Sequence, residues 1–171
     1  MVATGQLDQA ALERLYVELE KPVYNVVYRW LWDVGDAQEV VQEAFLRLWH
    51  MRARVDLATV KPLVYRIALN LASTRRRNKR LWAWVPFVDL ASSHNGVDDE
   101  LGAYQCRAEV REAVDSLPEE LRRVVMLCAF SEMSYAQVAE VLDIPSGTVG
   151  SRKNRAVAML KEKLERRGVH G

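Results

Sequence analysis

Apolar residues recur at the 3.6-residue period of an α-helix along most of the chain, so the sequence predicts helices before anything else. In the N-terminal part these helices are expected at residues 12–19, 22–31, 37–52 and 60–80. Pro22 occupies the first turn of the second helix, where its missing N–H is tolerated. Asp36 is expected to cap the third helix, with Glu39 as its capping-box partner.

The C-terminal part carries the same period in four segments, at residues 103–116, 118–130, 135–142 and 148–166. Ser134 and Ser146 stand where a hydroxyl would accept the first unpaired amides of the last two helices. A short turn at 143–145 separates these helices, and the small Ala139 permits their close crossing. The inward stripe of the last helix is expected to consist of Val149, Ala156, Val157 and Leu160. This layout is that of a helix-turn-helix, whose second helix enters the major groove of DNA.

The only extended break in helical periodicity contains a proline, a Ser-Ser-His-Asn-Gly cluster and three consecutive acids. A loop of this length is uncommon inside one compact domain. The sequence therefore predicts an all-α fold of two small helical domains and an acidic linker, at residues 1–81, 103–171 and 82–102. The rings of Trp82, Trp84 and Phe87 at the linker start either pack back onto the first domain or anchor the segment on a partner.

Composition is globular, since 50% of the 171 residues are hydrophobic and 27% are charged. The 24 basic and 23 acidic residues nearly cancel but are unevenly placed. Basic against acidic residues number 13 to 9 in residues 1–80, 2 to 7 in 81–117, and 9 to 7 in 118–171. The apolar runs are too short to cross a membrane and the first residues do not resemble a signal peptide, so we expect a cytoplasmic protein.

Neither the cysteines nor the histidines form a pattern typical of a metal site or a disulfide framework. Cys106 and Cys128 lie 22 positions apart without a CxxC partner, so we expect ordinary helix residues, with a redox role as the alternative. His50, His94 and His170 have no second ligand at a suitable spacing. We therefore expect no metal, no cofactor, no small-molecule substrate and no catalytic residue.

Polar residues of the helix-turn-helix gather away from its apolar stripe. The residues expected to face DNA are Ser146, Thr148, Gly150, Ser151, Arg152, Asn154 and Arg155. Gly150 costs a helix about 1 kcal/mol relative to alanine, which either a close backbone approach to DNA or a merely weak helix would explain. Lys153 falls within the apolar stripe, so either its stem lies along the core or the helical phase differs. A solvated helical hairpin is the alternative for the whole segment.

Two further polar surfaces precede the linker. The basic run 75–80 ends the predicted helix 60–80, with Asn70, Ser73 and Thr74 just before it. Such a run is commonly a solvated helix end, and it also suits a phosphate backbone or an anionic membrane surface. The other surface, on the predicted helix 37–52, carries Glu39, Gln42, Glu43 and Arg47, which by themselves indicate only solvent.

Three segments together resemble the extracytoplasmic-function (ECF) sigma factors, specificity subunits of bacterial RNA polymerase. DAQEVVQEAFLRLW at residues 36–49 resembles the helix of that family that binds core polymerase. VKPLVYRIALNLASTRRRNKR at 60–80 resembles the helix that melts and reads the promoter element nearer the start site. The segment at 117–156 resembles the domain that reads the element farther upstream. The three occur in the family's order and cover nearly the whole chain.

The resemblance implies partners and roles for these residues. The surface expected to meet core polymerase, whose β and β′ subunits are the implied partners, consists of Asp36, Glu39, Gln42, Glu43 and Arg47. The residues expected to hold the melted strand of promoter DNA are Asn70, Ser73, Thr74, Arg75, Arg76, Arg77, Lys79 and Arg80. An anti-sigma factor, in this family often at the inner membrane, is a further expected partner.

Some positions depart from the family's usual residues, which leaves the recognised promoter sequence open. The family commonly has an aspartate where Thr74 stands, a lysine at Gly150, an aliphatic residue at Lys153 and a histidine at Asn154. Two other functions remain as alternatives: a regulator that binds DNA alone through the helix-turn-helix, and a sigma mimic that only sequesters an anti-sigma factor. A mimic would not need the cations of 75–80 or Arg155.

Overall fold

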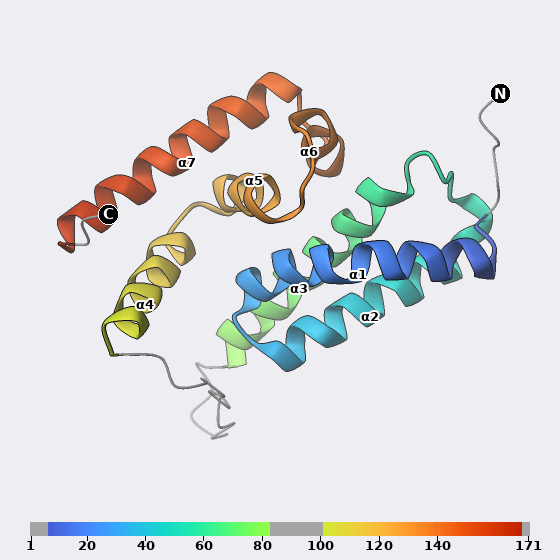
Figure 1. Cartoon of the computed structure of the whole chain (residues 1–171), viewed down its shortest axis with the longest axis horizontal. Helices are drawn as coiled ribbons and strands as arrows, with labels where there is room; N and C mark the ends of the chain where they lie inside the picture. Colours follow the sequence, from blue (N-terminus) through green and yellow to red (C-terminus); the bar gives the residue numbers. More distant parts are fainter. Residues whose placement is uncertain (1–6, 83–100, 169–171) are drawn as a thin grey trace.

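The computed structural model describes residues 7–82 and 101–168, and all regular secondary structure within them is helical (Figure 1). The elements are α1 (Gln9–Leu31), α2 (Val34–His50), the 3₁₀ turn η1 (Arg52–Arg54), α3 (Val60–Trp82), α4 (Leu101–Asp115), α5 (Glu119–Phe130), α6 (Tyr135–Leu142) and α7 (Ser146–Arg166). The predicted all-α fold is confirmed. No helix among the described residues is both long and apolar enough to span a bilayer.

Helices α1, α2 and α3 form an N-terminal bundle around a shared apolar core. The two helices predicted on either side of Pro22 are one continuous helix, α1. Interior proline costs a helix about 3 kcal/mol, but Leu19 and Val23 on both sides of it are fully buried in the same core, and this packing outweighs the cost. The predicted cap of α2 is also wrong, because Asp33 accepts the backbone N–H of Asp36 at 2.8 Å and the helix begins at Val34.

Helices α4 to α7 form the C-terminal half and contain the predicted helix-turn-helix. Helix α6 begins with a capping box in which the side chains of Ser134 and Gln137 each accept the other's backbone N–H. The predicted Ser146 cap is absent, since α7 already includes this residue and Pro145 precedes it without a side-chain bond. Val157 was expected to point inward but is 49% exposed, because Val149 and Ala156 set the buried face of the helix.

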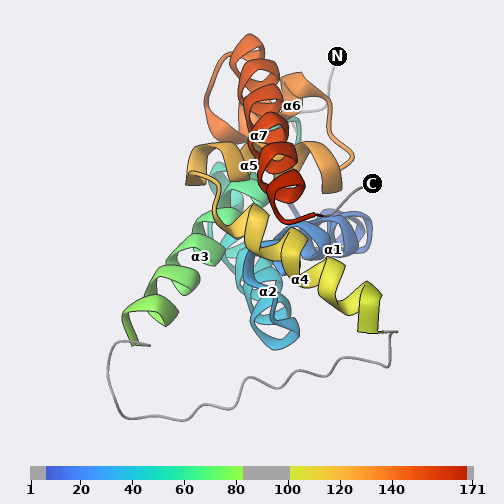
Figure 2. The same cartoon turned by 90° about the vertical axis from the view of Figure 1, so that its left-hand side faces the viewer.

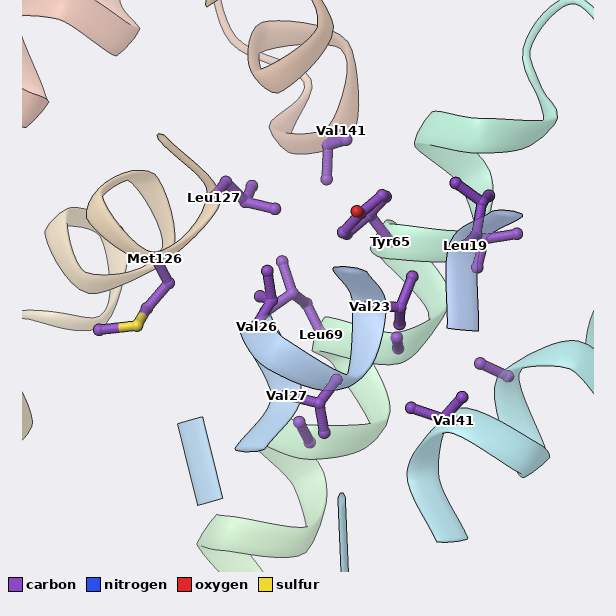
Figure 3. Close-up of a cluster of buried hydrophobic side chains, with 14 of the residues drawn as sticks. Leu19, Val23, Val26, Val27, Val41, Tyr65, Leu69, Met126, Leu127 and Val141 are labelled. Carbon is purple, nitrogen blue, oxygen red and sulfur yellow. The ribbon is translucent and has the colours of Figure 1, made fainter. Parts of the chain in front are cut away.

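The two halves pack against each other, and α5 lies between α7 and the α1–α3 bundle in both views (Figures 1 and 2). Their contact continues the apolar core from one half to the other. The side chains that line the contact come from α1, α3, α5 and α6 and include Val26, Tyr65, Leu69, Met126, Leu127 and Val141 (Figure 3). The segment with Trp84 and Phe87 lies outside the described residues, as does the side chain of Trp82.

Candidate nucleic-acid interface

The predicted polar surface of α2 is exposed at four of its five positions. Glu39, Gln42, Glu43 and Arg47 face outward, and Arg47 Nε lies 2.7 Å from a Glu43 carboxylate oxygen. The side chain of Asp36 is only 18% exposed and points instead at α3. There it pairs with Arg75 at 3.3 Å and with Lys79.

Beside this surface, α1 and α2 enclose an apolar hollow of about 880 Å³ that the sequence reasoning missed. Its apolar lining comes from Leu12, Tyr16, Val17, Phe45, Leu46 and Trp49, with Gln42 at its edge. Leu46 is 53% exposed although it lies between Glu43 and Arg47 on the polar side of α2. An apolar residue in a polar stripe was the signal available in the sequence, since exposed apolar patches mark docking surfaces.

A second hollow, of about 500 Å³, lies between α2 and α3 and is mostly polar in its lining residues. Its wall brings together residues predicted for two different surfaces: Asp36, Arg47, Asn70, Leu71, Thr74, Arg75, Asn78 and Lys79. Asn70, Thr74 and Asn78 follow one another at four-residue spacing, so they share one face of α3. Asn78 was not predicted as a site residue, although this spacing could have identified it.

Several cations of the basic run on α3 are already paired within the chain. Arg75 lies 2.8 Å from Glu39, and Lys79 lies 3.3 Å from Asp33. Burial alone would lower the pKa of Lys79, but its bonds to Asp36 and Asp33 raise it above the ordinary value. Arg77 and Arg80 are exposed. The net positive potential of this end of α3 is therefore smaller than its sequence indicates.

Three polar residues of α3, Asn70, Ser73 and Arg76, contact the C-terminal half. Arg76 Nη1 lies 2.8 Å from Asp115 Oδ1, and its side chain is 15% exposed. Arg123 of α5 donates to Asn70 Oδ1 at 3.2 Å and to Ser73 Oγ at 2.9 Å. Burial alone would raise the pKa of Glu119, but its bond and ion pair with Arg123 hold this pKa below the ordinary value.

The positions of the helix-turn-helix that the sequence predicts to face DNA are mostly accessible. Ser146, Ser151, Asn154 and Arg155 are exposed, while Thr148, Gly150 and Arg152 are half-buried. Arg152 pairs with Glu120 at 3.1 Å, which holds its guanidinium against α5.

Lys153 and Gly150 both lie next to Tyr135, the first residue of α6. Lys153 Nζ donates to the Tyr135 hydroxyl at 3.0 Å, and this bond raises the pKa of the lysine. The stem of Lys153 is thus half-buried while its ammonium stays at the surface. A Cβ added at Gly150 would lie 3.8 Å from a ring carbon of Tyr135, so packing within the chain does not require glycine there.

Cys128 is a half-buried residue of α5 that packs against the core, and burial raises the pKa of its thiol. The side chain of Cys106 lies outside the described part of α4. Within the described ranges, no three His, Cys, Asp or Glu side chains gather in a way that could hold a metal ion.

Comparison with known proteins identifies both halves. Residues 15–81 match the family model of Sigma-70 region 2, and residues 107–160 match that of Sigma-70, region 4. The ECF RNA polymerase sigma factor SigL of Mycobacterium tuberculosis is 32% identical over 165 residues, which cover 94% of this chain and 93% of SigL. The ECF RNA polymerase sigma factor SigE of Mycolicibacterium smegmatis is also 32% identical, over 95% of this chain and 65% of the relative.

A solved structure has the same arrangement of helices. It is the sigma factor RpoE in complex with the anti-sigma factor NepR from Bartonella quintana, with a TM-score of 0.64 and 18% identity over 90% of this chain and 96% of that chain. The helical fold, the matches to both family models and the similarity to SigL over most of the chain agree with one another. The chain belongs to the ECF RNA polymerase sigma factors, which confirms the family predicted from the sequence.

Proposed function

We propose that this sigma factor binds core RNA polymerase through α2 and the adjoining hollow, and promoter DNA through α3 and α7. The family makes it a promoter-recognising subunit of transcription initiation. The observation that carries the assignment of surfaces is that two surfaces of different character adjoin each other on one bundle and share Arg47. An exposed acidic and apolar face lies on one side of α2, and a polar hollow rimmed by cations lies between α2 and α3.

The core-binding surface combines Glu39, Gln42, Glu43 and Arg47 with the apolar hollow beside Gln42. Leu46 lies between them and joins the charged part to the apolar part. Interfaces of this kind pair a buried apolar centre with a charged rim that fixes the register. We assign the surface to the β′ clamp helices of core polymerase, with the β subunit as the other neighbour. Asp36 positions Arg75 and Lys79 and does not itself face this partner.

The hollow between α2 and α3 is the proposed pocket for an extruded base of the melted strand. Asn70, Thr74 and Asn78 supply short hydrogen-bonding groups along its wall, and Arg75 and Lys79 supply charge for phosphates. Extruding a base costs a few kcal/mol of stacking, which such a pocket can offset. The helix-turn-helix binds the element farther upstream, with Asn154 and Arg155 nearest the bases.

The proposed domain boundaries are those predicted from the sequence. Residues 1–81 form the domain that binds the melted promoter element, residues 103–171 form the domain that binds the upstream element, and residues 82–102 link the two. An anti-sigma factor is a further proposed partner, since the RpoE structure that this chain resembles is bound to one. A factor that serves core polymerase is expected to act in the cytoplasm.

Run-off transcription with core polymerase on fragmented genomic DNA tests the proposal. The wild-type chain is expected to produce discrete transcripts that core polymerase alone does not. Asn70→Ala should slow promoter melting more than closed-complex formation. Arg155→Ala should weaken upstream binding by about 1–3 kcal/mol if it contacts a guanine. Promoter footprints that do not require polymerase would instead favour a stand-alone regulator.

A further inference from the structure

One aromatic ring connects the two helices of the helix-turn-helix at the protein surface. Tyr135 is the first residue of α6 and is 43% exposed. A Cβ added at Gly150 of α7 would lie 3.8 Å from a carbon of this ring, so the ring packs close to the α7 backbone there. Lys153 follows Gly150 by three positions and therefore shares its face of the helix. The ring thus lies between α6 and a lysine of α7.

The hydrogen bond between Lys153 and Tyr135 leaves the proton of the tyrosine available. Lys153 Nζ donates to Tyr135 Oη at 3.0 Å, and the ammonium lies 5.2 Å from the centre of the ring. A phenol can accept one hydrogen bond and donate another. Within residues 7–82 and 101–168, no hydrogen bond uses the Tyr135 O–H as its donor. The pair therefore presents an ammonium and a hydroxyl as donors, together with one positive charge.

The charge of Lys153 is not balanced by a carboxylate of the described part of the chain. Lys153 forms no ion pair there, whereas the neighbouring Arg152 pairs with Glu120 at 3.1 Å. The Cys128 thiol of α5 is close enough to affect the ammonium, but burial raises the pKa of this thiol, so it is neutral at neutral pH. The bond to Tyr135 raises the pKa of Lys153 and keeps it protonated. An anion is the ligand that such a pair can bind.

The pair borders the surface that the proposed function gives to promoter DNA. Asn154 follows Lys153 directly and shares a face of α7 with Gly150, four positions earlier. In a helix-turn-helix bound to DNA, the second helix lies in the major groove while the first crosses the sugar-phosphate backbone. Groups contributed jointly by the first residue of α6 and the flank of α7 are therefore expected to lie where a phosphate passes.

We propose that Tyr135 and Lys153 form a phosphate clamp for duplex DNA, in which the ammonium supplies the charge and the tyrosine hydroxyl both positions it and donates to the same phosphate. The inference rests on the proposed function, because it adds a contact to the DNA-binding surface of α7. A phosphate carries no sequence information directly. The phosphate clamp thus fixes the position of α7 on the duplex and does not choose the bases that are read.

Three variants of the full-length chain and one control test the phosphate clamp. Lys153→Met removes the charge and keeps an apolar stem against Tyr135, whereas Lys153→Arg keeps the charge. Tyr135→Phe keeps the ring and removes only the hydroxyl. Lys161→Met is the control, because Lys161 carries the same charge on α7, two turns further from the helix start, and its side chain is 76% exposed beside Glu165. Circular dichroism checks that each variant folds.

The probes are two fluorescein-labelled DNA duplexes of equal length and different random sequence, and fluorescence anisotropy measures their dissociation constants across a salt series. Each phosphate contact contributes about 0.9 to the slope of log affinity against log salt concentration. Lys153→Met is therefore expected to make this slope shallower by about 0.9. It should also weaken binding about fivefold to tenfold at about 0.1 M salt, equally on both duplexes.

The other variants separate the charge from the hydroxyl. Lys153→Arg should keep the wild-type slope, because the charge remains. Tyr135→Phe should weaken binding about threefold, the order expected from losing one hydrogen bond, without a change in slope. Lys161→Met should match the wild-type chain in both affinity and slope.

Wild-type slope and affinity in Lys153→Met would overturn the phosphate clamp, and so would a loss confined to one duplex, which would indicate a base contact. Wild-type affinity in Tyr135→Phe would overturn the role of the hydroxyl. If Lys153→Met does not fold, Lys153→Gln takes its place, because the amide can stay at the surface. Binding of the wild-type chain to core polymerase is measured in parallel. A chain that binds neither core polymerase nor duplex would refute the proposed function, whereas binding to both with unchanged variants would refute only the phosphate clamp.

Discussion

Replacing Asp36 by asparagine tests whether this residue positions the cations of α3 or contacts polymerase. The carboxylate of Asp36 lies between α2 and α3, where it pairs with Arg75 at 3.3 Å and with Lys79. Asparagine has nearly the same size and keeps one oxygen but no charge. The substitution therefore removes both ion pairs without leaving a cavity.

The expected loss of stability follows from three contributions. Each of the two ion pairs contributes up to about 1 kcal/mol, since Arg75 and Lys79 remain partly in solvent. Asp36 also lies in the first turn of α2, where an acid gains about 0.3–1 kcal/mol from the helix dipole. Because the new amide keeps part of this bonding, we expect a net loss of about 1.5 kcal/mol in the free energy of unfolding.

Urea denaturation followed by circular dichroism measures this loss, and titration with core polymerase measures binding. Glu39→Gln is the matched control, because Glu39 pairs with the same Arg75 but its side chain is 67% exposed. We expect Asp36→Asn to lower the free energy of unfolding and leave polymerase affinity unchanged. We expect Glu39→Gln to leave the free energy of unfolding nearly unchanged and to lower polymerase affinity. An Asp36→Asn protein of wild-type stability with impaired polymerase binding would refute the reasoning and return Asp36 to the interface.

Three further changes test local features of the fold. Asp33→Ala should cost about 1 kcal/mol by removing the α2 cap, as urea unfolding would reveal. The backbone N–H of Asp36, with help from Lys79, holds the pKa of Asp33 below its ordinary 3.8, so this contribution is present above that pH and is lost as pH falls through the folded value. An equal difference at acidic and neutral pH would count against it. Gly150→Ala should raise the free energy of unfolding by about 1 kcal/mol while weakening promoter binding. An unchanged affinity for promoter DNA would show that the backbone at this position does not approach DNA closely. Leu127→Ala should cost about 2–5 kcal/mol, because this fully buried side chain lies where the halves meet, and a loss below about 1 kcal/mol would contradict that packing.

Helical periodicity was sufficient to predict the elements that local sequence determines. Ser134 and Gln137 form a capping box within one turn, so both the start of α6 and its amphipathic pattern are visible in the sequence. Val149 and Ala156 likewise fix the buried face of α7. Pro22 was misleading because its local cost is overcome by core contacts with residues distant in sequence.

The sequence predicted which residue types form the candidate site, but not which of these residues contact one another. The polar stripe of α2 was found, yet the inward direction of Asp36 depends on how α2 crosses α3, which periodicity does not reveal. Arg123 and Asn70 meet across 53 positions of sequence, and no local pattern connects them. The contact between the halves was missed for the same reason, since a linker in the sequence does not indicate whether the flanking domains touch.

The dissociation constant of the purified chain for core RNA polymerase tests the central claim most directly. The account predicts a stable one-to-one complex that the double charge reversal Glu39→Lys, Glu43→Lys weakens by about tenfold or more, the order expected of charges that contact the partner. The same reversal at Glu162, on α7, should leave the constant unchanged. Failure of the wild-type chain to form any complex with core polymerase would contradict the account.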